Sequence, residues 1–233
     1  MNKNILLFLF CVLILHLNAQ ESTKKRFHIG LSAGAAVPFG DYESTAVNNE
    51  GAGFARIGLC EAINVGYRFA DKFGIALQLN AFKNPVDEEG MKNVFRRMDP
   101  SLYWNLQSDP WVVNSFSGGF MYSEIFEKID LDLRVLIGSC YVSSPALDVF
   151  AANNENSVRI TQHEASNNTM GILLGFSSRF HLGPYISLSL NLDYLSLTPE
   201  FKVLFVYDEE ASLYSFSQKI DVLNLSAGLA VRF

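Results

Sequence analysis

The stretch that decides the fold is residues 27–39, FHIGLSAGAAVPF, in which two kinds of side chain alternate. The odd positions are apolar along the whole length: Phe27, Ile29, Leu31, Ala33, Ala35, Val37 and Phe39. The even positions are small or polar: His28, Gly30, Ser32, Gly34, Ala36 and Pro38. A period of two is typical of a β-strand whose two faces meet different surroundings. The stretch therefore predicts a strand with one continuous apolar face.

The same alternation returns along the rest of the chain. Seven further stretches show it, namely 54–69, 73–82, 111–126, 129–143, 170–182, 185–197 and 223–233. The stretch 111–126 shows the pattern most weakly. Together with 27–39, they predict eight strands of roughly 10 to 16 residues, long enough for the roughly 9–11 residues with which a tilted strand crosses a bilayer.

The connections between these stretches are alternately short and long. The short ones are 70–72, 127–128 and 183–184, and the long ones are 40–53, 83–110, 144–169 and 198–219. In an antiparallel sheet this order places all tight turns at the same end of the strands, together with both chain ends. Transmembrane barrels are built in this way, with short periplasmic turns and longer extracellular loops.

The polarity of the two faces separates a membrane barrel from the alternative, a soluble barrel of the lipocalin type. A soluble barrel turns apolar side chains inward and polar ones to water. Here the face opposite the apolar one consists of Gly, Ser, Asn, Asp and Arg, which favours a polar lumen. Aromatic residues at the strand ends predict two interfacial girdles. These are Phe27, Phe69, Phe73, Phe126, Phe180, Tyr185 and Phe233 by the short turns, and Phe39, Phe54, Phe82, Trp111, Tyr141 and Tyr194 by the long loops. We expect an all-β protein, an eight-stranded antiparallel up-and-down transmembrane β-barrel of the outer membrane.

Composition excludes several other classes of protein. The 233 residues carry a formal net charge of −6, with 49% hydrophobic and 18% charged side chains. Intrinsic disorder needs lower hydrophobicity, and a polytopic helical membrane protein needs apolar runs of about 18 residues or more, which this chain lacks. The negative balance argues against a nucleic-acid partner, because such proteins carry basic patches.

The first twenty residues read as a cleaved signal peptide. Lys3 supplies the positive start, residues 5–17 the apolar stretch, and residues 18–20, Asn-Ala-Gln, the cleavage region. A retained anchor is the alternative. Residues 21–233 then form one barrel domain. Its cysteines, Cys60 and Cys140, fall on nearly opposite walls, so we expect both thiols to be free.

Several motifs resemble those of the small outer-membrane β-barrels of Bacteroidota known as PorT-like barrels. They are the signal ending 18–20, residues 34–42 (GAAVPFGDY), 51–54 (GAGF), 84–89 (NPVDEE) and the final Val231-Arg232-Phe233. The resemblance covers nearly all of residues 21–233. It implies residence in outer-membrane lipid and insertion by the barrel assembly machinery, which recognises a terminal Phe. It implies no particular chemistry.

Charged residues recur on the face predicted to line the lumen. They are Arg68, Asp132, Arg134, Arg179, Asp193 and Arg232. An unpaired charge in a narrow barrel is costly, so we expect a hydrogen-bonded network. One interpretation is a polar plug that fills the lumen, since eight strands leave room only for side chains. The other is a narrow anion-preferring pore, because Arg outnumbers Asp.

Signals for catalysis are weak. Some eight-stranded barrels modify lipids with a Ser and a His, and His181 with Ser178 is the nearest such pair here. Alternation places these two side chains on opposite faces of one strand, and the chain has no Gly-x-Ser-x-Gly elbow. No spacing of His, Cys or Asp predicts a metal site. We therefore expect neither an enzyme nor a cofactor, with a lipid-modifying enzyme as the less favoured alternative.

The long loops remain as candidates for function. Met91, Val94, Phe95 and Met98 recur at helical spacing and predict a short amphipathic helix. This helix could bind a partner, lie on the outer leaflet or fold over its own barrel mouth. Phe95, Tyr103 and Trp104 are candidate contact residues. Loops of this length on a rigid scaffold predict a binding or assembly role, with an envelope protein or an external ligand as partner. A purely structural barrel is the alternative.

Overall fold

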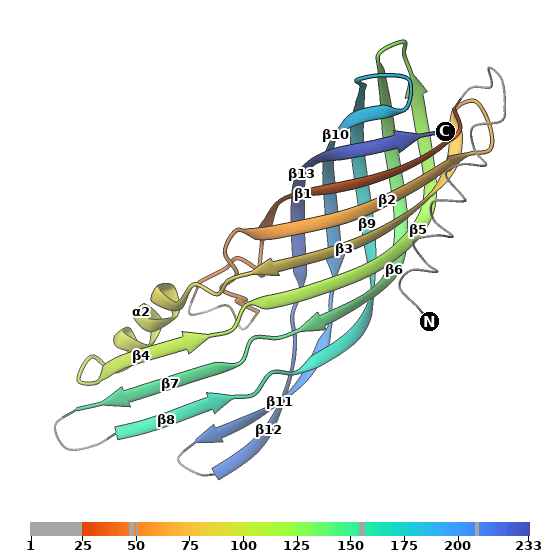
Figure 1. The fold of residues 1–233 in the computed structure, drawn as a ribbon. Coiled ribbons are helices and arrows are strands. Elements are labelled where there is room, and N and C mark those ends of the chain that lie inside the picture. Colours follow the sequence, from red (N-terminus) through yellow and green to blue (C-terminus); the bar gives the residue numbers. More distant parts are fainter. Residues whose placement is uncertain (1–24, 47–48, 50, 154–156, 208–209) are drawn as a thin grey trace, which may run out of the picture.

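Eight strands close into one antiparallel barrel in the computed structural model (Figure 1). The structure describes residues 25–46, 49, 51–153, 157–207 and 210–233. The predicted signal peptide, residues 1–20, lies outside these ranges. The prediction of an eight-stranded antiparallel barrel is confirmed.

The barrel strands follow the predicted stretches closely. They are β1 (Phe27–Phe39), β2 (Gly58–Arg68), β3 (Phe73–Asn84), β5 (Trp111–Ile125), β6 (Ile129–Ser143), β9 (Ser166–His181), β10 (Ile186–Leu197) and β13 (Ile220–Arg232). Around the barrel their order is β1-β13-β10-β9-β6-β5-β3-β2, and β1 pairs with both β13 and β2 to close the wall. The tight turns, the start of β1 and the end of β13 lie at one rim of the barrel, here called the short-turn end. The opposite rim is the long-loop end.

The outside of the barrel is an apolar belt. Large apolar side chains point away from the axis on all eight strands, among them Leu31, Ile63, Leu77, Leu79, Phe116, Phe120, Leu133, Ile137, Ile172, Leu188 and Leu229. A soluble monomer rarely exposes a contiguous apolar surface of this extent. The belt is the surface that a lipid bilayer covers in a transmembrane barrel.

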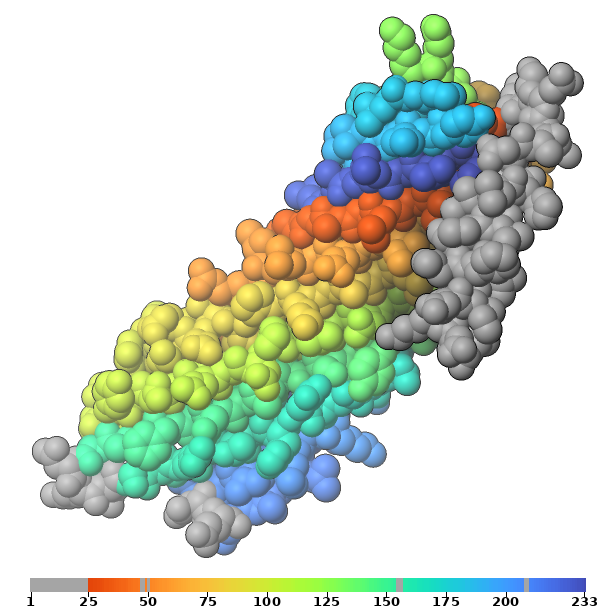
Figure 2. Space-filling view, viewed as in Figure 1, coloured from red at the N-terminus to blue at the C-terminus, as the bar shows by residue number. Residues whose placement is uncertain are grey.

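Three of the long loops contain strands that the sequence analysis missed. These are β4 (Tyr103–Ser108), β7 (Leu147–Ala152), β8 (Ser157–Gln162), β11 (Glu200–Tyr207) and β12 (Glu210–Ser217). They form a five-stranded sheet in the order β12-β11-β8-β7-β4. Each precedes or follows one barrel strand, and their order matches that of β13, β10, β9, β6 and β5. The sheet, here called the outer sheet, therefore prolongs five of the eight barrel strands beyond the long-loop end (Figures 1 and 2).

Over the other three strands, β1, β2 and β3, the wall stops and a helix takes its place. Helix α2 (Glu88–Met98) begins at Asp87, whose carboxylate accepts a hydrogen bond of 3.2 Å from Gly90 N. Its first turn is acidic and its last turn basic, as the helix dipole favours. The predicted amphipathic helix is thus present, and it packs on the chain's own outer sheet, where the Phe95 and Trp104 rings stack at 5.0 Å. Within the described ranges, no helix has the length and apolarity needed to cross a membrane.

Candidate functional site

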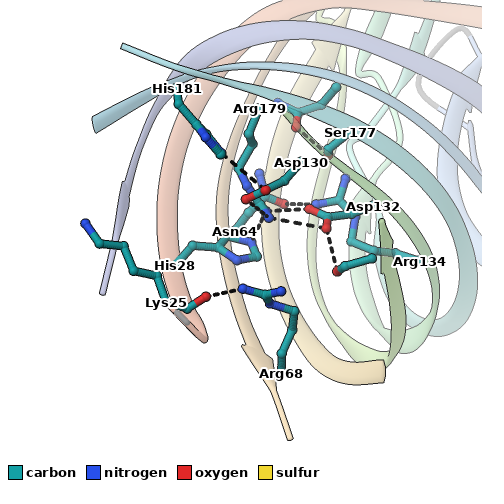
Figure 3. Close-up of polar contacts among 12 residues, drawn as sticks. Lys25, His28, Asn64, Arg68, Asp130, Asp132, Arg134, Ser177, Arg179 and His181 are labelled. Atoms are coloured by element: carbon teal, nitrogen blue, oxygen red, sulfur yellow. Dashed lines mark hydrogen bonds and ion pairs between the residues drawn. The ribbon is translucent and has the colours of Figure 1, made fainter. Parts of the chain in front are cut away.

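The barrel interior changes character along its axis. In the half nearer the short turns, here called the short-turn half, the inward side chains are charged or polar. In the half nearer the long loops, the long-loop half, most of them are apolar or aromatic. The first half holds most of the charges predicted from the sequence (Figure 3).

One centre of the charged half is Arg179 on β9. Its guanidinium bonds Asp132 on β6 and lies 3.4 Å from Asp130 Oδ2. It also donates a 2.7 Å hydrogen bond to His28 Nε2 on β1. Ser123 Oγ donates to Asp132 Oδ1 at 2.6 Å. All these side chains are buried, and the Arg179 guanidinium is shared by the two carboxylates.

The second centre is the ion pair of Arg134 and Asp193. Arg134 Nη2 lies 2.8 Å from Asp193 Oδ1, and Gln78 Nε2 donates to Asp193 Oδ2 at 2.9 Å. Arg134 Nη1 also donates to Asn64 Oδ1 at 3.1 Å. Arg134 and Asp193 lie on β6 and β10, which are separated by β9, and both are in register with Gly175. Because Gly175 has no side chain, Arg134 can reach across it; a Cβ there would lie 2.8 Å from Arg134 Nε.

Arg68 and Arg232 lie away from these two centres. Arg68 donates to the main-chain carbonyl of Lys25, and Arg232 Nη2 donates to Gly183 O at 2.9 Å. Both are therefore placed at the short-turn rim. Sequence reasoning placed His28, Asn64 and Gln78 on the polar face but did not include them in the charge network, and it missed Asp130. Their inward position follows from alternation, since Asp130 shares the parity of Asp132 and Arg134, but their partners depend on the register between strands.

The histidine and serine considered for catalysis are not brought together. His181 Nε2 lies 3.2 Å from Asp130 Oδ1, and its Nδ1 lies 3.2 Å from Glu127 O. Ser178 is in register with Leu131 and Leu190, whose side chains face away from the lumen. Among the described residues, no group of three or more His, Cys, Asp or Glu is placed to hold a metal ion.

The long-loop half is closed by a hydrophobic plug, which corrects the expectation of a polar lumen throughout. Most inward side chains there are buried and apolar: Phe82, Val113, Leu136, Val142, Leu173, Leu195, Leu197, Ile220 and Val222. The buried Asn84 among them has hydrogen-bond partners in Tyr42 and two main-chain carbonyls. Cys60 and Cys140 are buried and free, as predicted.

Aromatic side chains from the mouth complete the plug. Residues 40–46 and 51–57 fold inward, so that Tyr42 packs edge-on against Trp111 at 5.7 Å. Phe201 of the outer sheet lies 5.8 Å from Trp111. Trp111 Nε1 donates to Gly53 O at 2.9 Å. The girdle prediction is wrong for Phe54, Phe82 and Trp111, which are buried in or beside this plug. Phe82 and Trp111 stand at positions whose side chains point into the barrel. This direction, and not their place at a strand end, decides that they are buried.

The outer sheet carries two of the residues predicted as contacts, Tyr103 and Trp104, and helix α2 carries the third, Phe95. Tyr103 is 70% exposed, whereas Trp104 is buried against Phe95. A cavity of about 230 Å³ lies between residues 51–57, helix α2 and the outer sheet, with Met91, Phe205, Tyr214 and Phe216 in its walls. Sequence reasoning found Tyr103 but missed β12, because nothing in the sequence showed that its stretch forms the edge of a sheet.

The structure is similar to several solved outer-membrane proteins. A major outer membrane protein from Thermus thermophilus superimposes with a TM-score of 0.50 at 16% identity, covering 89% of this chain and 99% of that chain. The fold is that of an outer-membrane β-barrel. Neisserial surface protein A (TM-score 0.47, 13% identity, 89% and 97% coverage) and the Escherichia coli outer membrane protease OmpT (0.48, 7%, 91% and 99%) have related structures. The sequence matches no protein-family profile and no curated protein. In this fold the short-turn end faces the periplasm and the outer sheet lies outside the cell.

Proposed function

We propose that this protein is a non-catalytic outer-membrane barrel with a closed lumen, which binds a protein partner of the cell envelope through its outer sheet. The observation that carries this proposal is the unprotected edge strand β12. The membership in the PorT-like barrels of Bacteroidota, insertion by the barrel assembly machinery through Phe233 and the role in assembly are parts of the same proposal. They rest on the sequence resemblance.

The two edges of the outer sheet differ. The β4 edge lies beside helix α2, which stacks Phe95 on Trp104. Strand β12 pairs with β11 on one side, and no described strand pairs with its other side. Proteins usually protect an edge strand with charges, a proline or a covering element. Residues 211–217, ASLYSFS, contain no charge and no proline, and Leu213 and Tyr214 are 75% and 58% exposed on opposite faces. Such an edge favours pairing with an extended strand of another polypeptide.

Two observations weigh against the alternatives. The hydrophobic plug fills the long-loop half mainly with apolar side chains, which favours a closed lumen over an anion-preferring pore. The separation of His181 from Ser178 removes the pair on which a lipid-modifying enzyme was considered.

Affinity purification from native outer membranes tests the proposal. Wild type is compared with a variant in which Leu213 and Tyr214 are both changed to Lys, and with a Phe150→Lys variant as control. Phe150 is exposed on β7, inside the same sheet and away from the β12 edge. We expect a defined set of envelope proteins with wild type and Phe150→Lys, and its loss with the β12 variant. The proposal is wrong if wild type retains no protein, or if the β12 variant retains the same set.

A further inference from the structure

One ionisable side chain interrupts the lipid-facing belt. Along β2 the side chains that point away from the lumen are Leu59, Glu61, Ile63, Val65 and Tyr67. Leu59 and Ile63, on either side of Glu61, are 77% and 41% exposed. The Glu61 carboxylate therefore lies between apolar side chains on the outer surface of the barrel, which Figure 2 shows from the side of β2 and β3.

Register places Glu61 level with the middle of β1, between the two rims of the barrel. It lies directly opposite Ala33 on β1 and Ala81 on β3. Beyond Ala33, β1 continues toward the long-loop end with three more lipid-facing residues, ending at the exposed aromatic Phe39. A charge on the lipid face costs free energy that grows with depth. No described residue forms a hydrogen bond or an ion pair with Glu61, so nothing within the described structure offsets this cost.

Glu61 borders a groove in the barrel wall. The residue opposite it on β3 is Ala81, which has only a methyl side chain. Ala81 in turn lies opposite Asn114 on β5. Two adjoining hollows, of about 480 Å³ and 700 Å³, open at this point, and all three residues line both of them. We call these two hollows the Glu61 groove.

The groove is amphipathic along its length. Toward the short-turn end its lining is apolar, with Leu31, Ile63, Leu79 and Phe116. On the other side of Asn114 the lining is polar. Asn114 lies opposite Tyr141 on β6, and Tyr141 lies opposite Asn168 on β9. Beyond β1, Ala33 lies opposite Ala227 on β13, and Ala227 lies opposite Leu190 on β10. Both residues are apolar. Next to Glu61 the polar groups therefore lie on the β5 side, whereas the two nearest positions beyond β1 are apolar.

The chemistry of the groove defines what fits it. Its apolar part matches an acyl chain, and its polar part matches a headgroup that donates hydrogen bonds. A carboxylate attracts an ammonium group and repels an anionic headgroup. Lys83 lines the larger of the two hollows and supplies a cation for the phosphate of the same lipid. We infer that the Glu61 groove binds a phospholipid whose headgroup carries a primary ammonium group, with Glu61 as its ligand.

Lipid titration of the full-length barrel tests this inference. The purified protein in detergent is mixed with phosphatidylethanolamine, phosphatidylcholine or phosphatidylglycerol of identical acyl chains, and bound lipid is counted by native mass spectrometry. We expect phosphatidylethanolamine to bind about tenfold more tightly than the other two, the size of effect that one charge-assisted hydrogen bond gives. The preference should vanish in Glu61→Gln, which keeps the size of the side chain.

A matched control separates the site from a general charge effect. Glu124 is another carboxylate on the barrel wall, near the short-turn end, and it pairs with Lys72 at 2.6 Å. Glu124→Gln should leave the lipid preference unchanged. Glu61→Leu should abolish the preference and, in vesicles without phosphatidylethanolamine, raise the stability of the barrel, because it removes a charge from the lipid face.

Three outcomes would overturn the inference. Equal binding of the three lipids to wild type would show that the groove does not select a primary ammonium group. A preference retained in Glu61→Gln would show that Glu61 is not the ligand. A dimer of wild type that dissociates in Glu61→Gln would assign the groove to a second copy of the chain. Heat-modifiable gel migration confirms that each variant is folded before it is scored.

Discussion

The two halves of the barrel interior are built from the same eight strands and the same inward positions, yet they are filled in different ways. The short-turn half holds the Arg134–Asp193 pair and the Arg179 cluster, whereas the long-loop half packs Phe82 and Trp111 into a hydrophobic plug. Alternation decides only that a side chain points inward. The residue at each level of the barrel then decides how space is filled. A charged layer needs every partner present, while a packed layer can adjust to partial loss.

The largest effect should come from removing one charge of a buried pair. Asp193→Leu leaves Arg134 buried without its carboxylate, so we expect a loss of about 4 kcal/mol in the free energy of unfolding. Urea unfolding of the refolded barrel in lipid vesicles measures it. The double variant Arg134→Met/Asp193→Leu should recover most of the loss. If the single and double variants lose equal stability, the pair does not act as described.

Opening the plug should cost somewhat less. Phe82→Ala removes a fully buried ring, for which we expect about 3 kcal/mol from lost burial and the remaining cavity. The same unfolding experiment applies. Phe120→Ala, on the lipid-facing side of β5, serves as control in the same experiment and should cost clearly less. A smaller loss in Phe82→Ala than in Phe120→Ala would contradict the hydrophobic plug.

The glycine beneath the ion pair gives a third test. Gly175→Ala places a methyl group against Arg134 and Asp193, and we expect a loss of about 2 kcal/mol from overpacking. Gly183→Ala is the matched control, because a Cβ at Gly183 would meet no atom within 4 Å. Equal stability of the two variants would show that Arg134 does not cross β9 at Gly175.

An exposed ion pair of the outer sheet should have the smallest effect. Arg159 donates hydrogen bonds of 2.9 and 2.6 Å to Asp148, which holds the pKa of that carboxyl below its ordinary value. The resulting stabilisation is present above the ordinary carboxyl pKa and is lost as pH falls through the lowered value. Because water and salt screen an exposed pair, Arg159→Ala should lower the stability at neutral pH by less than any of the three preceding variants. Unfolding at several pH values checks this, and a loss as large as that of Asp193→Leu would contradict the contrast between exposed and buried pairs.

Sequence alternation predicted the barrel well and its filling only in part. Strands β1 and β6 begin and end where 27–39 and 129–143 predicted, because long, strictly alternating stretches leave little choice of register. The short strands β7 and β8 have six residues each, too few for their period to stand out inside a loop. The inward direction of Arg134 and Asp193 was predictable, but their pairing was not, because it depends on the register of β9 between them. The burial of Trp111 depends on Tyr42 and Gly53 folding into the mouth, a contact between segments far apart in the sequence.

Planar-bilayer recording tests most directly whether the barrel is closed. The purified wild-type protein is inserted at low protein density and recorded in potassium chloride, beside a Phe82→Ala/Trp111→Ala variant that removes two rings of the plug. We predict no stable conductance steps for wild type, because the hydrophobic plug fills the long-loop half mainly with apolar side chains. Steps of wild type with anion preference, altered by Arg134→Ala or Arg179→Ala, would contradict a closed lumen and establish the pore.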